Sequence, residues 1–156
     1  MIIQTDGPRL NASGNYGSLE SFASVHALEQ AAVSRLKQGR ESALRSITGA
    51  PEKITFTDLT AALKQNDPLT VELFTQSAAY FGIGLANLLN ILHPEKVILG
   101  GPLINAHPLF FRVSTKVAIQ NTYYYPIYQV VFSQGRLGEE ALVTGAAVMV
   151  INKLTE

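Results

Sequence analysis

Apolar side chains recur every three or four residues in several parts of the chain, a spacing typical of helices with one buried face. The first such part begins at Ser18, a plausible N-cap, and stops at Gly39. Its buried face is expected to consist of Phe22, Val25, Leu28, Ala32 and Leu36. Helicity is expected to resume over residues 41–47. Thr57 is then expected to cap a short helix that ends at Leu63.

The longest predicted helix follows the pair Asp67-Pro68, in which a capping carboxylate precedes a proline in the first helical turn. Pro94 is expected to end it. Gly82 and Gly84 lie inside this helix, and each lowers helix propensity by about 1 kcal/mol relative to alanine. They therefore predict a close-packed neighbouring element. The apolar stripe of the helix is expected to be Phe74, Phe81, Leu85, Leu88 and Leu92.

Two short apolar runs in the second half of the chain predict strands. The first covers residues 96–101 and ends in a glycine pair, and the second covers 128–133. Helices are predicted around 108–121 and 139–154. Strands that alternate with helices in this way predict an α/β fold with a parallel sheet and crossover helices. The inward side chains of the last helix are expected to be Leu142, Ala146, Met149 and either Ile151 or Leu154.

The composition changes this picture in one respect. The 156 residues fit one domain, but 47% are hydrophobic and only 15% are charged. Some surface is therefore expected to be covered by a partner lobe or by another copy of the chain. The helices at 68–92 and 108–121 are the expected contacts. Residues 75–94 carry no formal charge, but their polar side chains and glycines favour a buried helix over a membrane span.

The charge balance and the absence of cysteine exclude several classes of function. Twelve basic and twelve acidic residues give a net charge of zero, so the chain by itself should bind DNA poorly. The chain has no cysteine, which excludes disulfides and thiolate metal sites and is compatible with a reducing cytosol. His26, His93 and His107 fall on different predicted elements, so no metal or catalytic role is predicted for them.

Two glycine-containing segments are candidates for chemistry. Residues 11–20 form a glycine-rich loop before the first helix; its simplest interpretation is a turn in which Glu20 only complements the helix dipole. Gly100 and Gly101 end the first strand, where ligands of open α/β sheets approach the backbone, although glycines also end strands for local reasons. The tyrosine run 123–126 has no basic residues around it, which favours a loop packed on a neighbouring lobe over a base-stacking surface.

The loop and the glycine pair, taken in this order, resemble the ROK family of repressors, open reading frames and sugar kinases. The signature of that family has a Gly-His pair, a variable stretch and then C-x-C-G-x-x-G-C-x-E. Residues 87–101 and 137–147 resemble the helix-to-strand segment and the closing helix of the family. The family's three cysteine places are occupied here by Asn11, Ser13 and Ser18, while Gly14, Gly17 and Glu20 fit the pattern.

The resemblance implies that residues 1–156 are the single C-terminal lobe of an actin-like ATPase (ribonuclease H-like) fold, in a larger, soluble, cytoplasmic protein. It implies that Glu20 accepts hydrogen bonds from sugar hydroxyls. It also makes Gly100 and Gly101 the remnant of a nucleotide site. The family's zinc ligands are a histidine and three cysteines. Asparagine and serine cannot replace thiolates on zinc, so no metal and no other cofactor is expected.

The resemblance implies no catalytic residue in this chain, because the family's phosphate-binding segment, catalytic aspartate and helix-turn-helix would lie outside it. Gly14-Asn15 and the run at 100–103 favour the repressor branch. The expected function is the sugar-responsive effector and oligomerisation region of a ROK-type transcriptional regulator. Its expected partners are a sugar in the full-length protein, DNA through an absent N-terminal domain, and further copies of itself, with no membrane. Half of an ATP-dependent sugar kinase and a degenerate structural lobe remain as alternatives.

Overall fold

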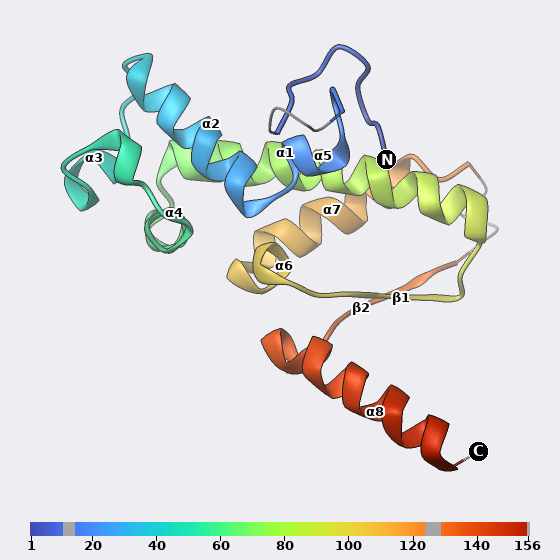
Figure 1. The fold of residues 1–156 in the computed structure, drawn as a ribbon. Coiled ribbons are helices and arrows are strands. Elements are labelled where there is room, and N and C mark those ends of the chain that lie inside the picture. Colours follow the sequence, from blue (N-terminus) through green and yellow to red (C-terminus); the bar gives the residue numbers. More distant parts are fainter. Residues whose placement is uncertain (11–14, 124–128, 156) are drawn as a thin grey trace.

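The computed structural model describes residues 1–10, 15–123 and 129–155, and it places a long helix, α5, through the middle of the body (Figure 1). The N-terminal segment, α1 and α2 lie on one side of α5, while α7, α6 and the two strands lie on the other (Figure 1). The elements are α1 (Leu19–Phe22), α2 (Val25–Lys37), α3 (Leu44–Ile47), η1 (Pro51–Lys53), α4 (Phe56–Lys64), α5 (Pro68–Leu92), β1 (Lys96–Leu99), α6 (Pro102–Ala106), α7 (Pro108–Gln120), β2 (Val131–Gln134), η2 (Gly138–Glu140) and α8 (Ala141–Thr155).

The strands β1 and β2 pair in parallel, with Lys96 opposite Val131 and Leu99 opposite Gln134. Because parallel strands cannot be joined by a tight turn, the chain crosses between them through α6 and α7. The predicted α/β class with a parallel sheet is therefore confirmed. The short α6 was not predicted, and β2 begins at Val131; Tyr128, where the prediction began this strand, lies outside the described residues.

The core is built around α5, whose Phe74, Ala78 and Leu89 are fully buried. At Gly82 an added Cβ would lie 2.6 Å from the backbone oxygen of Ser114 on α7. At Gly84 it would lie 2.9 Å from a methyl carbon of Leu19. Both glycines therefore allow the close packing that the sequence predicted.

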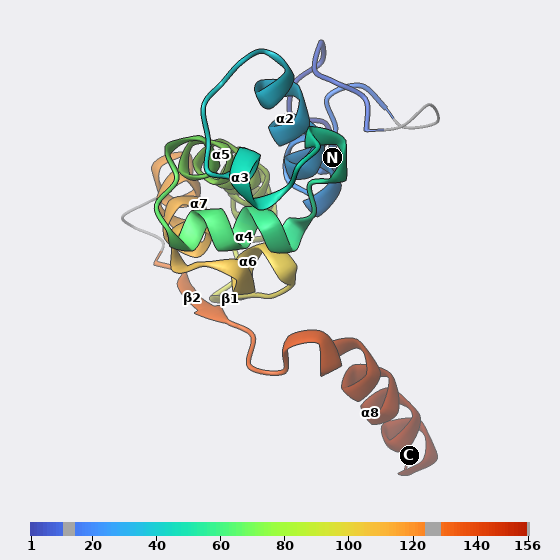
Figure 2. The same ribbon diagram turned by 90° about the vertical axis from the view of Figure 1, so that its left-hand side faces the viewer.

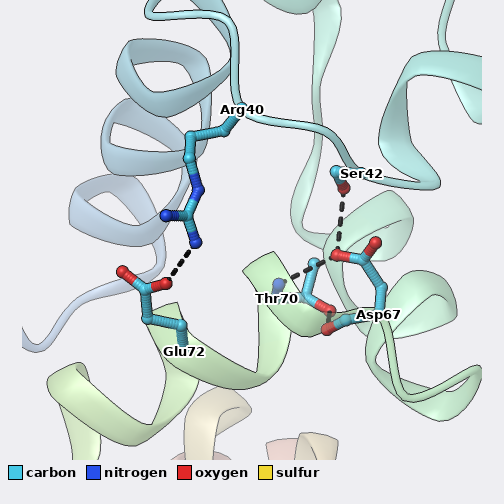
Figure 3. Close-up of polar contacts among 5 residues, drawn as sticks. All are labelled: Arg40, Ser42, Asp67, Thr70 and Glu72. Carbon is cyan, nitrogen blue, oxygen red and sulfur yellow. Dashed lines mark hydrogen bonds and ion pairs between the residues drawn. The ribbon is translucent and has the colours of Figure 1, made fainter.

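The start of α5 is fixed by Asp67, as predicted, and this carboxylate also binds a distant loop (Figure 3). Its Oδ2 accepts hydrogen bonds from the Thr70 backbone N–H (2.9 Å) and the Ser42 hydroxyl (2.9 Å), and its Oδ1 accepts one from the Ala43 N–H (2.8 Å). Asp67 is 6% exposed. Burial favours the neutral carboxyl, but the hydrogen bonds from Ala43, Thr70 and Ser42 outweigh it and lower the pKa of Asp67.

The predicted helix from Ser18 to Gly39 is wrong as a single element, because the chain breaks at Ala23 and Ser24 into α1 and α2. The Ser24 hydroxyl accepts a hydrogen bond from the Ala27 N–H (3.1 Å) and thereby caps α2. Ser18 precedes α1 but makes no side-chain cap; its hydroxyl pairs with that of Ser21 (2.8 Å). Ser24 can begin a new helix because the short side chain of serine competes for nearby backbone donors.

The start of α4 also differs from the prediction, because Thr55 rather than Thr57 is its N-cap. The Thr55 N–H donates to Asp58 Oδ2 (2.9 Å), while the Asp58 N–H donates to Thr55 Oγ1 (3.4 Å). This reciprocal pair is a capping box, in which the residue three positions after the cap decides which threonine begins the helix.

The C-terminal part of the predicted core is also corrected. Leu88 and Leu92, expected in the stripe of α5, are 43% and 66% exposed, because the buried face there runs through Leu85, Ala86 and Leu89. The helix α8 points away from the body in both views (Figures 1 and 2). The side chains expected to turn inward on it, namely Ala146, Met149 and Ile151, are therefore exposed; those of Leu142 and Leu154 lie outside the description. Among the described residues, no helix combines the length and the apolar character needed to cross a membrane.

Candidate functional site

Glu20 lies in the first turn of α1, and its side chain is exposed. The backbone just before it is held by the N-terminal segment. The Gly17 oxygen accepts a hydrogen bond from the Ile3 N–H (2.8 Å), the Gly17 N–H donates to the Pro8 oxygen (2.9 Å), and the Leu19 N–H donates to the Met1 oxygen (2.8 Å). These bonds come from peptide groups, so this half of the loop is fixed without any cysteine or histidine.

Side chains of α1 fix this short helix to α5. The Phe22 ring stacks on the Tyr80 ring, with centroids 4.1 Å apart and planes at 23°. Leu19 packs into the space left by Gly84. Glu20 thus presents an acceptor-only carboxylate to solvent from a helix that is held on its other side. Such a carboxylate can accept hydrogen bonds from hydroxyl or N–H donors.

Gly17 is the residue on which this arrangement depends. Its φ is +60°, a conformation that glycine adopts readily and other residues rarely do. A Cβ at this position would lie 1.4 Å from the Gln4 carbonyl oxygen. Gly7 is also crowded, because a Cβ there would lie 2.8 Å from the Gly17 Cα. Sequence reasoning missed Gly7, although the Asp-Gly-Pro run around it is a recognisable turn signal.

Gly100 and Gly101 lie where β1 ends, and they line a cavity of about 970 Å³. Gly101 has a φ of +107°, and a Cβ on either glycine would meet no atom within 4 Å. Gly135 follows β2 in the same way, and its N–H donates to the Leu99 oxygen (2.8 Å). The cavity therefore opens beyond the carboxyl ends of both parallel strands, the usual place for ligands in open α/β sheets.

Lys64 and Arg136 are the charged side chains that line this cavity among the described residues, and none of the described acidic side chains lines it. Such a lining favours an anion. Sequence reasoning missed both cations, although Gly135-Arg136 repeats after the second strand the strand-glycine pattern seen after the first. Glu20 does not line the cavity, so the structure does not bring the two predicted sites together in one pocket.

The histidines lie apart from each other, as predicted. His26 is on α2, His93 ends α5 with a φ of +46°, and His107 caps α7 by accepting the Leu109 N–H on Nδ1 (3.2 Å). Within the described part of the chain, no group of three or more histidine, aspartate or glutamate residues could hold a metal ion. Asn11 and Ser13 lie outside the described residues, and the absence of bound zinc stays a prediction.

Tyr123 is the only described member of the tyrosine run at 123–126, so the predicted packing of that run on a neighbouring lobe falls largely outside the described residues. Its side chain is 85% exposed, and its backbone N–H donates to Asn90 Oδ1 (2.9 Å).

Comparison with known proteins gives one family. The ROK family model matches residues 1–153. The xylose repressor of Caldicellulosiruptor bescii is 33% identical over 141 residues, which is 90% of this chain and 35% of the repressor. A ROK family glucokinase from Streptomyces griseus, solved with glucose and AMPPNP, superposes with a TM-score of 0.82 at 27% identity over 96% of this chain and 49% of the kinase. A ROK family transcriptional regulator, a homolog of the Escherichia coli MLC protein, superposes with a TM-score of 0.73 at 28% identity over 86% of this chain and 32% of the regulator. The chain thus spans about a third to a half of the length of these relatives.

Proposed function

The chain belongs to the ROK family, and from this premise we propose that it is the sugar-responsive effector and oligomerisation region of a transcriptional regulator, without catalytic activity of its own. The observation that carries the proposal is the placement of Glu20. Its carboxylate is exposed on α1, and peptide hydrogen bonds and the Phe22–Tyr80 stack hold that helix. The similarity to a xylose repressor over 90% of the chain supports the regulator branch.

In this proposal Glu20 accepts hydrogen bonds from two sugar hydroxyls in the full-length protein. An ionised carboxylate offers two oxygens, and hydrogen bonds to a charged group contribute about 1.5–3 kcal/mol. This argument does not depend on zinc ligands at residues 17–20, because backbone hydrogen bonds with Met1, Ile3 and Pro8 hold that part of the loop.

The Glu20→Gln variant of the full-length protein should bind its sugar roughly tenfold or more weakly, since the amide keeps the shape and removes the charge. Calorimetry on both proteins measures this effect. Glu29→Gln is a matched control, because Glu29 lies on α2 and its Oε1 accepts the Phe56 N–H (2.9 Å). Equal sugar affinity in the wild-type and Glu20→Gln proteins would leave Glu20 as a charge at a helix end.

In this proposal the cavity beyond β1 and β2 is the remnant of a nucleotide site, and Gly100 and Gly101 form part of its wall. Lys64 and Arg136 supply positive charge that would attract phosphates. Phosphoryl transfer also requires magnesium ligands and a base or water-positioning group. Among the described residues no carboxylate lines this cavity, which is in keeping with a site that binds without catalysing.

A kinase half is the second candidate, favoured by the superposition on a glucokinase that contains glucose and AMPPNP. The chain alone should show no turnover when ATP and a panel of hexoses are supplied in a coupled assay. Turnover that follows the protein through purification would favour the kinase instead. A helix-turn-helix or an Asp-x-Gly-x-Thr segment in the rest of the coding sequence separates the two candidates for the full-length protein.

The oligomerisation part of the proposal rests on exposed apolar side chains. The faces of α5 and α7 that were expected to form the contact pack partly on each other at Gly82 and Ser114. Exposed apolar side chains lie at the end of α5, within the first of the two expected helices, and along α8; they include Leu88, Ile91, Leu92, Val143, Met149 and Ile151. Sedimentation velocity should show self-association that Met149→Lys weakens, whereas a monodisperse monomer at every concentration would exclude it.

A further inference from the structure

The helix α8 presents apolar side chains to solvent on several sides, because it points away from the body of the molecule (Figures 1 and 2). Val143, Met149, Val150 and Ile151 are 74%, 75%, 60% and 58% exposed. At 100° per residue these four positions are spread around the helix axis. A helix that is apolar all round is normally buried, so α8 requires a surface that covers it.

One face of α8 combines two valines with two alanines. Val143, Ala146, Ala147 and Val150 lie on the same side of the helix, because they are separated by three, one and three residues. The side chains of all four are exposed. We call these four residues the α8 seam. The two alanines at its centre allow a second helix to approach closely.

The α8 seam lies between two exposed charges of opposite sign. Glu140 directly precedes α8, and Lys153 is in its last turn. Neither side chain belongs to an ion pair within the described part of the chain. Glu140 lies six residues before Ala146, and Lys153 lies six residues after Ala147. The surface is therefore complementary to a copy of itself that runs in the opposite direction.

We propose that α8 docks in antiparallel orientation on α8 of a second copy of this 156-residue chain. This inference rests on the self-association in the proposed function and names the surface that makes it. The two-fold axis passes between Ala146 and Ala147, so that the same surface is used by both copies and the contact closes as a dimer. Two chains with no net charge do not repel each other at long range.

The residues on either side of the axis then meet in pairs. Val143 of each copy faces Val150 of the other, and Glu140 of each copy faces Lys153 of the other. A parallel pair would instead place equal charges together. Charges that flank an apolar helix contact determine its orientation, whereas the apolar contact supplies most of the affinity.

Val150→Glu should weaken the dimer at least tenfold in sedimentation equilibrium, because it places a carboxylate in the α8 seam. Val148→Glu is the matched control. Val148 is also an exposed valine of α8, but it lies on the side opposite Val143 and Val150, so its effect should stay below about twofold. Met149 borders the seam, three residues from Ala146 and four from Lys153, so Met149→Lys should have an intermediate effect.

Reversal of the two charges tests the orientation of the pair. Glu140→Lys alone and Lys153→Glu alone should each weaken the dimer roughly fivefold, because each places like charges opposite one another. The double variant should return to within about twofold of the wild type. Its charges oppose the dipole of α8 at both ends, so restored association cannot come from a more stable helix.

Cysteine crosslinking is a second test, because the chain contains no cysteine of its own. Ala147→Cys lies beside the two-fold axis and should crosslink to itself on oxidation. Val143→Cys should not, since its two copies lie about 10 Å apart along the helix pair. A mixture of Val143→Cys and Val150→Cys should form the crosslinked heterodimer, and Val148→Cys should stay uncrosslinked.

The results separate this inference from the proposed function. A monomer at every concentration overturns both the antiparallel pair and the proposed self-association. A dimer in which Val148→Glu and Val150→Glu have equal effects, or in which Val143→Cys crosslinks to itself, overturns the pairing of α8 alone. Failure of the double charge reversal to restore the dimer also overturns that pairing, and α8 is then covered by a different surface.

Discussion

Replacing Asp67 with alanine is expected to lower the free energy of unfolding by about 3 kcal/mol, a large share of the stability of a domain this size. The substitution removes the cap of α5 and leaves the Thr70 and Ala43 N–H groups and the Ser42 hydroxyl without their acceptor. Loss of a cap alone costs about 1 kcal/mol, and each buried donor left unpaired adds to it. Chemical denaturation of both proteins measures the difference.

Asp67→Asn should cost less than Asp67→Ala, because asparagine is an equally good cap but presents an NH₂ group where one carboxylate oxygen stood. Glu72→Ala is the control from the same region (Figure 3). Its carboxylate pairs with Arg40 at 2.6 Å, and such exposed pairs contribute about 0–1 kcal/mol. Equal losses for Asp67→Ala and Glu72→Ala would contradict the role assigned to the buried carboxylate.

The Asp67 effect should depend on pH in a defined direction. Since folding lowers the pKa of this carboxyl, its stabilising contribution is present above the unfolded-state pKa of about 3.9. It is lost as the pH falls through the lower pKa of the folded state. The difference in stability between the wild type and Asp67→Asn should therefore be constant near neutral pH and shrink below about pH 4.

The elements with strong local signals were predictable from the sequence. Asp67 and Pro68 fix the start of α5, and the two strands follow from short apolar runs that end in glycine. The break at Ser24 and the start of α4 at Thr55 depend on which nearby side chain takes a backbone donor. Several serines and threonines in each stretch could have done so, and periodicity does not choose among them.

The sequence motif proposes the residues of the candidate site, but it does not show which bonds hold them in place. The motif singles out Glu20 and Gly17, yet the bonds that hold Gly17 and Leu19 come from Met1, Ile3 and Pro8, a segment with no periodic pattern. The orientation of α8 could not be predicted either. An apolar helix predicts burial, but its sequence does not state which surface covers it.

Replacing Gly17 with alanine is expected to release the N-terminal segment from α1. The positive φ costs about 1 kcal/mol for a residue with a side chain. The Cβ would in addition lie 1.4 Å from the Gln4 oxygen, so this backbone must move. That movement breaks the bonds from Ile3 and Gln4 to the Gly17 oxygen. Amide hydrogen exchange at Ile3 and Leu19 should accelerate strongly.

Gly39→Ala separates the two causes, because Gly39 also has a positive φ, of +89°, but a Cβ there would meet nothing within 4 Å. The Gly39→Ala variant should show only the energetic cost of the positive φ. Amide exchange at Ile3 and Leu19 should stay unchanged. If amide hydrogen exchange at Ile3 and Leu19 is as slow in the Gly17→Ala variant as in the Gly39→Ala variant, the N-terminal segment does not hold the loop. In the full-length protein the same two variants, Gly17→Ala and Gly39→Ala, test whether sugar binding depends on the placement of Glu20. Gly17→Ala should weaken sugar binding about as much as Glu20→Gln, and Gly39→Ala should not, because a carboxylate binds two hydroxyls well only when its helix is held in place.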